Sequence, residues 1–169
     1  MTTSRLIALC ALLASLGGCV VWPHHHLSAP RISGTVTCAG KPVAGARVRL
    51  ADLMTTQGTV AADATTLDAV TDARGHFSIG PIRRFAWTGT VPVLGVAQHT
   101  FPWGLQLSTD ARGWQPGWLE DPTLFAYVVN ATVVARCDLG APARSSVIGG
   151  NPSLVGNGSC TLTTAESSK

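Results

Sequence analysis

Three consecutive histidines, His24, His25 and His26, are the first residues in the chain whose types and spacing suggest chemistry. Imidazole nitrogens are good ligands for Zn²⁺, Cu²⁺ and Ni²⁺, so this run is the candidate metal-binding site of the sequence. It lies between two prolines in a stretch without alternation, which we expect to be an irregular tether. An evolved metal site needs fixed geometry and hydrogen-bonding partners behind its ligands. We therefore expect no resident metal or other cofactor, and we rank metal binding behind the functions considered below.

The N-terminal segment has the pattern of an export signal. Arg5 precedes an apolar stretch, residues 6–14, that is too short to remain in a bilayer as a permanent span. The segment ends in Leu16-Gly17-Gly18-Cys19, which resembles the lipobox of bacterial lipoproteins. That resemblance implies cleavage before Cys19 and acylation of this cysteine, which would anchor the protein in membrane lipid through two or more chains. Because the next residue is not Asp, the same resemblance implies the outer membrane, with the protein facing the periplasm.

The remaining cysteines predict one disulfide. The lipobox resemblance removes Cys10 with the signal and acylates Cys19, which leaves Cys38, Cys137 and Cys160. An oxidising periplasm favours pairing of two of these three. We prefer Cys137 with Cys160, with Cys38 as a buried core thiol, and we keep Cys38 with Cys137 as the runner-up.

From residue 31 onward the pattern is that of short strands separated by turns. Only 12% of the residues are charged, and two Lys and two Glu cannot supply the ion pairs that decorate exposed helices. Apolar residues alternate over 32–38 and again over 46–50, and we expect these two strands to form a hairpin with the arginines of the second facing water. The sequence predicts a poor strand within 52–70, a turn at 71–75 and a long strand over 125–137.

The first of these strands and the turn at 71–75 carry a family resemblance. The stretches ISGTVTCAGKPVAGARVRLAD and VTDARGHFSI resemble the carboxypeptidase regulatory-like domain. The resemblance covers 32–82 and implies an all-β, antiparallel β-sandwich of the transthyretin-like type, in a family whose members are mostly accessory modules. It assigns no catalytic residue. The matching positions are Gly34, Val36, Gly40, Pro42, Val43, Gly45, Ala46, Val48, Leu50, Thr71, Asp72, Gly75 and Phe77.

The pentapeptide TDARG occurs at 71–75 and again at 109–113, and we expect two similar turns. Pairing Leu107 with Trp114 around the second copy would place Trp103 opposite Trp118, so that one face carries three tryptophans. Flat indole rings can stack on sugars, but the neighbouring leucines favour core packing, with Trp118 at the rim. An exposed glycan-binding platform is the alternative.

The segment 81–102 is where this chain departs most from the family pattern, and long loops are where function concentrates. Arg83 and Arg84, with Trp87 nearby, are candidate contacts for an anionic partner, although adjacent arginines at a strand end are commonly solvated charges. No run of five basic residues exists, which makes nucleic acid a poor partner.

These observations predict a signal at 1–18, a lipid-anchored tether at 19–30, a β-sandwich at 31–139 and a C-terminal tail at 140–169 that a disulfide could tie back. The sequence lacks the nucleophile elbow, zinc-protease helix, phosphate loop and dinucleotide fingerprint, so we do not expect an enzyme. We expect a non-catalytic interaction or structural module that binds another envelope protein, with a glycan as the alternative ligand.

Overall fold

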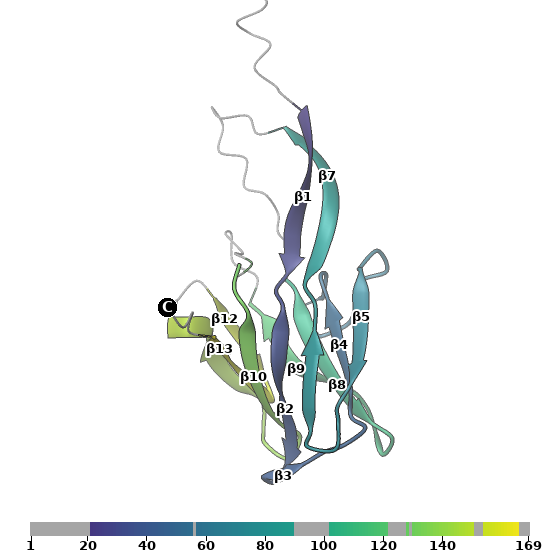
Figure 1. Ribbon diagram of the computed structural model, residues 1–169, viewed down its shortest axis with the longest axis vertical. Coiled ribbons are helices and arrows are strands. Elements are labelled where there is room, and N and C mark those ends of the chain that lie inside the picture. Colours follow the sequence, from purple (N-terminus) through teal and green to yellow (C-terminus); the bar gives the residue numbers. More distant parts are fainter. Residues whose placement is uncertain are drawn as a thin grey trace, which may run out of the picture. The chain divides into compact units, whose positions relative to one another are not determined.

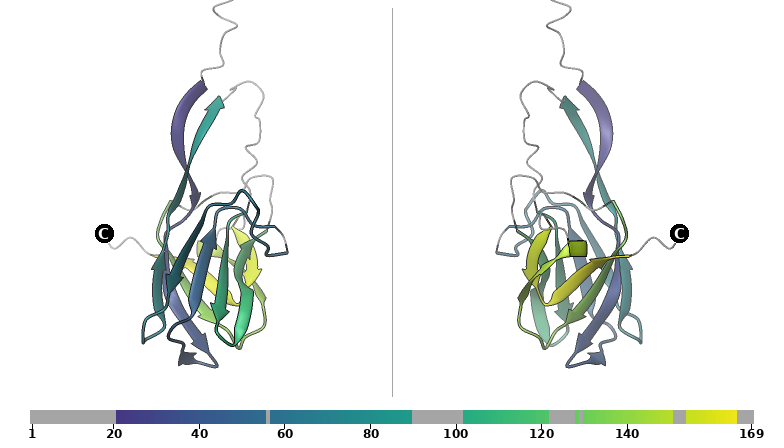
Figure 2. Two further views of the ribbon diagram at one scale, coloured as in Figure 1. Left: turned by 90° about the vertical axis from the view of Figure 1, so that its right-hand side faces the viewer. Right: turned by 90° about the vertical axis from the view of Figure 1, so that its left-hand side faces the viewer.

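The computed structural model describes residues 21–55, 57–89, 102–121, 128, 130–150 and 154–165, without the side chains of 21–24, 86–89 and 112. In this part of the chain the protein is all-β (Figure 1). Its strands form a two-stranded, a five-stranded and a six-stranded sheet. Figure 2 shows the two larger sheets from two sides. They share one buried apolar cluster, as expected for a β-sandwich.

The five-stranded sheet is built around β2 (Ile32–Cys38), whose bounds match the predicted strand. Its order is β13-β10-β2-β3, with β6 also paired to β2. The β2–β10 pair is parallel, so the sandwich is not antiparallel throughout as expected. The other members are β3 (Lys41–Pro42), β6 (His76–Ile79), β10 (Val133–Asp138) and β13 (Cys160–Thr164).

The six-stranded sheet has the order β11-β12-β9-β8-β4-β5 and is antiparallel in every pair. The expected hairpin between 32–38 and 46–50 is wrong, because β4 pairs with β5 and β8 and not with β2. Thr71 holds the crossing between the sheets: its hydroxyl donates to Val43 O and accepts from Ala46 N. The members are β4 (Arg47–Ala51), β5 (Thr66–Val70), β8 (Gly104–Thr109), β9 (Arg112–Glu120), β11 (Arg144–Val147) and β12 (Val155–Gly158).

The expected irregular tether is a strand. β1 (Val21–Ala29) pairs with β7 (Ile82–Gly89) in the two-stranded sheet. A two-stranded ribbon leaves one edge of each strand unpaired, and this is the setting in which a strand tolerates a proline such as Pro23. Residues 21–26 and 85–89 of this ribbon belong to a different compact unit from the sandwich.

The C-terminal segment is part of the sandwich and not a tail. After β11 and the 3-10 turn η1 (Ile148–Gly150), β12 joins the six-stranded sheet and β13 joins the five-stranded sheet. Ile148, Leu154 and Leu162 are buried there. These scattered apolar residues fill the core, although the high glycine and serine content of the segment suggested irregular chain.

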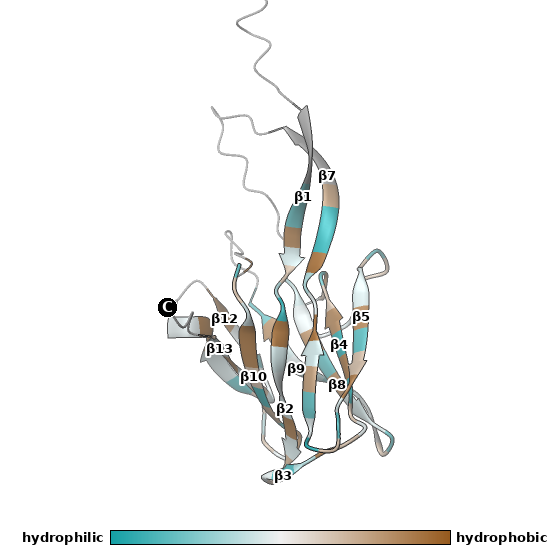
Figure 3. Ribbon diagram, viewed as in Figure 1, coloured by the Kyte–Doolittle hydropathy of each residue, from teal (hydrophilic) through white to brown (hydrophobic). Residues whose placement is uncertain are grey.

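The alternation of the strands correctly predicts which residues face the core. Phe77 and Ile79 are buried in β6 while the residues before each of them are exposed. In β10, Val133, Ala135 and Cys137 are buried, and Figure 3 shows the alternation of polar and apolar residues in this sheet. This strand begins only at Val133, because Asn130 and Ala131 lie in a bend. The predicted strand positions 125–127 and 129 lie outside the described residues.

The two TDARG copies differ in structure. In the first, Asp72 Oδ1 accepts hydrogen bonds from the backbone N–H groups of Arg74 and His76, and Gly75 has a φ of +75°. This is the predicted turn. The second copy is a tighter hairpin in which Thr109 pairs with Arg112, so Gly113 already lies within β9.

Candidate interaction surface

Trp103 and Trp118 lie in the core and not on a surface. Both are fully buried, and their ring centroids are 4.6 Å apart at an interplanar angle of 30°. The preference for core packing is confirmed for these two rings, whereas the expectation that Trp118 lies at the rim is wrong. β9 is displaced against β8 by irregularities at Leu105/Gln106 and Leu107/Thr109, which invalidates the predicted pairing. A platform of three exposed tryptophans is therefore not formed.

Trp114 lies on the outer face of the six-stranded sheet, where two arginines of β4 cover its ring. The guanidinium carbon of Arg49 is 4.3 Å from the ring centroid, and that of Arg47 is 5.4 Å away. Alternation along β4 sends Val48 and Leu50 into the core and the two arginines outward, as predicted. The contact is a cation–π cluster built from two strands that are not neighbours in the sheet.

Asp68 of β5 fixes one of the two arginines. Arg49 Nε and Nη2 donate to the two carboxylate oxygens at 2.7 and 2.9 Å, in a bidentate pair. This hydrogen bond lowers the pKa of Asp68, with a further contribution from the positive charge of Arg47, and raises the pKa of Arg49. More than half of the Asp68 side chain is exposed, so the pair orients Arg49 and contributes little stability.

An apolar side chain continues this surface onto the edge strand β5. Val70 pairs in register with the outward-facing Arg47 and is 62% exposed. We call the set Arg47, Arg49, Asp68, Val70 and Trp114 the Trp114 surface. It combines an aromatic ring, two arginines and an exposed aliphatic side chain, and Trp and Arg are the residue types that dominate binding energy at protein interfaces.

The two predicted contact residues Arg83 and Arg84 have different surroundings in the structure. Arg84 Nε lies 3.3 Å from the buried carboxylate of Asp52, and Arg84 Nη2 donates to Asp63 O at 2.7 Å. These bonds tie Arg84 to the segment before β5 and engage it within the fold. Arg83 is exposed and lines a hollow of about 380 Å³ together with Arg31 and Asn130. The side chain of Trp87, and residues 90–101 of the predicted loop, lie outside the described residues.

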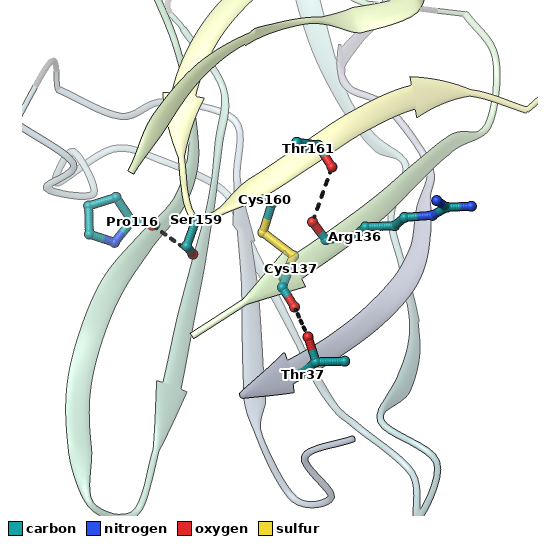
Figure 4. The surroundings of a disulfide bond; sticks show 7 residues. All are labelled: Thr37, Pro116, Arg136, Cys137, Ser159, Cys160 and Thr161. Atoms are coloured by element: carbon teal, nitrogen blue, oxygen red, sulfur yellow. Dashed lines mark hydrogen bonds between the residues drawn. A yellow bond between two sulfur atoms is a disulfide. The ribbon is translucent and has the colours of Figure 1, made fainter. Parts of the chain in front are cut away.

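The preferred disulfide is present. Cys137 and Cys160 occupy directly paired positions on β10 and β13 (Figure 4) and are bonded at 2.04 Å. Cys38 is free, but it is half-buried and not a fully buried thiol as expected. The predicted acylation site, Cys19, lies outside the described residues.

The described part of the chain holds no group of three His, Cys, Asp or Glu side chains that could bind a metal. Within the ribbon unit, His25 packs edge-on against Phe85 with ring centroids 5.3 Å apart, and the side chain of His24 is not described. Among the described residues no helix has the length and apolar character needed to span a membrane.

Sequence reasoning missed Glu120, a buried acid at the end of β9. Glu120 is 3% exposed, and neither of its carboxylate oxygens has a hydrogen-bond partner among the described residues. Burial raises the pKa of this carboxyl from 4.5 to about 8, because the ionised form has lost its hydration. Its position two residues after the inward-facing Trp118 was the available signal.

No protein-family model matches this chain, and no curated protein or solved structure matches it. The geometry of the Trp114 surface is therefore the main guide to function.

Proposed function

We propose that this protein is a non-catalytic envelope lipoprotein, anchored through acylated Cys19 and acting as a protein-interaction or structural accessory module at the periplasmic face of the outer membrane. The export pattern and the lipobox at residues 16–19 support the location. The disulfide between Cys137 and Cys160 fits an oxidising compartment. The resemblance to carboxypeptidase regulatory-like domains supports an accessory role, since it assigns no catalytic position.

The Trp114 surface is the single observation that carries the interaction role. A half-buried indole under two guanidinium groups presents a rigid contact area, because Asp68 and the strand pairing already restrict Arg49. A partner that covers this surface would pay little ordering entropy and would desolvate the cation–π cluster, which strengthens it. Arg47 forms no salt bridge among the described residues, and Asp68, whose pKa its charge helps to lower, is paired with Arg49, so an acidic side chain of the partner fits beside Arg47.

Recovery of the partner from cells tests this proposal. Cells expressing the wild type, Trp114→Ala or Cys19→Ser are treated with a membrane-permeant crosslinker, and the purified protein is analysed by mass spectrometry. We expect one envelope protein to be recovered with the wild type and lost with both variants. Recovery of the same proteins with Trp114→Ala as with the wild type would show that the Trp114 surface does not bind the partner. Recovery of the partner with Cys19→Ser would show that binding does not need the lipid anchor.

Fractionation of the same cells tests the location separately. The wild type is expected in the outer-membrane fraction with a mass increase that matches acylation of residue 19. Cys19→Ser is expected in the soluble periplasmic fraction. An unmodified wild type would contradict the lipoprotein assignment and leave the surface untouched.

A further inference from the structure

The outer face of the five-stranded sheet carries a polar row that the Trp114 surface does not include. Strand register places His76 of β6 beside Thr35 of β2, Thr35 beside Arg136 of β10, and Arg136 beside Thr161 of β13. Adjacent strands lie about 4.8 Å apart, so the row extends across about 14 Å. It is continuous over four strands of one rigid sheet.

Two hollows lie along this row and meet at its centre. One, of about 260 Å³, is lined by His76 and Ser33, and the other, of about 460 Å³, extends past the disulfide to Arg144. Both are lined by Thr35 and Arg136, so the two hollows adjoin at this pair, and we call them together the furrow. Figure 4 shows Arg136 projecting from β10 away from the disulfide.

The polar groups in the furrow have a defined hydrogen-bonding state. Thr37 donates its hydroxyl to Cys137 O at 3.1 Å and Thr161 donates to Arg136 O at 3.4 Å, so both offer lone pairs to a ligand. Asp138 Oδ1 is occupied by the backbone N–H groups of Ala39 and Gly140. Arg136 has no ion pair among the described residues and brings five N–H donors to the furrow.

We propose that this furrow binds an extended acidic glycan, with Arg136 and Arg144 facing its carboxylate groups and the threonine hydroxyls facing its sugar hydroxyls. Arg136 and Arg144 both line the larger hollow, and the one carboxylate there, Asp138, is engaged through Oδ1 by two backbone N–H groups. Two separate guanidinium groups suit a chain with repeated charges better than a single small anion. A peptide strand fits less well, because β2 and β10 are paired on both sides and have no free backbone edge for it.

This site combines the outer face of the five-stranded sheet with Arg144 of the edge strand β11 and shares no residue with the Trp114 surface. It does not depend on the proposed protein partner, so either can fail alone. The full chain, purified in detergent, is titrated calorimetrically with hexagalacturonate, with cellohexaose as the neutral control and hexaglutamate as the peptide control. Arg136→Gln is the test variant, because Arg136 makes no side-chain bond within the described fold. Arg83→Gln, at an exposed arginine that lines neither hollow, is the matched control.

We expect hexagalacturonate to bind, and Arg136→Gln to weaken the binding at least tenfold while Arg83→Gln leaves it within twofold. Cellohexaose should bind far more weakly. Absence of heat with hexagalacturonate at millimolar concentration, or equal loss in both arginine variants, would overturn the site. Equal or tighter binding of hexaglutamate would overturn the glycan assignment in favour of an acidic peptide.

Discussion

Arg49 lies over the indole ring of Trp114 with its guanidinium carbon 4.3 Å from the ring centroid, while Asp68 holds the same guanidinium at 2.7 Å. A single arginine thus joins strands β4, β5 and β9 across the outer face of the six-stranded sheet. Trp114→Ala removes this contact without opening the core. We expect the free energy of unfolding to fall by only about 1 kcal/mol, measured by urea denaturation. A fall of more than about 4 kcal/mol would mean that Trp114 is a core residue and not a binding residue.

Arg84 and Arg83 form a matched pair for testing the role of the buried Asp52 carboxylate. Arg84→Ala leaves this carboxylate without its ion-pair partner, and we expect the free energy of unfolding to fall by about 2 kcal/mol or more. Arg83→Ala changes an exposed neighbour and should shift it by less than about 0.5 kcal/mol. Equal effects of the two substitutions, in thermal or urea denaturation, would argue against the Arg84–Asp52 pair.

Glu120 predicts a fall in stability as the pH rises. The pKa of its carboxyl group is about 8 in the folded protein, against an ordinary value of 4.5. Between these two pH values the folded protein therefore binds a proton that the unfolded chain has lost. The contribution of protonated Glu120 to the free energy of unfolding is therefore fully present below pH 4.5. It declines as the pH rises towards 8, by about 4 kcal/mol in total. Urea denaturation at pH 5 and pH 8 measures the change.

Glu120→Gln should abolish this part of the pH dependence, whatever its effect at a single pH. Asp110→Asn, at the exposed tip of the β8–β9 hairpin, should leave the dependence unchanged. A wild type and a Glu120→Gln variant with the same slope would show that Glu120 ionises normally in the folded protein.

The Cys137–Cys160 bond closes a sequence separation of 23 residues, for which the chain-entropy model gives about 3 kcal/mol. Cys137→Ala with Cys160→Ala should lower the free energy of unfolding by about that amount. Cys38→Ala, which removes the free thiol, should cost less because Cys38 is half-buried. Thiol titration of the denatured, non-reduced protein should find Cys38 reactive and the paired cysteines unreactive.

Periodicity predicted which side chains are buried, but it could not predict strand partners. Residues 46–50 alternate as expected, yet β4 joins the other sheet, because alternation fixes the face of a strand and not its neighbour. The same limit affected the tryptophans. The irregularities in β8–β9 shift the register, and this separates Trp114 from the buried Trp103–Trp118 pair.

Composition gave a wrong expectation of irregular chain at both ends of the described structure. Two prolines and three histidines in residues 20–30 indicated an irregular tether, so β1 was not predicted. This strand forms by pairing with β7 and not because of a strand pattern in its own sequence. The glycine-rich C-terminal segment forms β12 and β13, where Gly156 leaves the space that the ring of Trp118 occupies. The disulfide was predictable because few cysteines were available. The polar row that contains Arg136 was not, because it depends on a parallel β2–β10 register that alternation does not reveal.

Site-specific photocrosslinking in living cells shows directly whether the Trp114 surface binds a partner. A photoreactive residue replaces Val70 on the Trp114 surface, and a control probe replaces Thr163, which is exposed on the opposite sheet. We expect a discrete crosslinked product with one envelope protein from position 70, which the additional substitution Trp114→Ala removes. No product from position 70, or the same product from both positions, would contradict the claim that this surface binds a partner.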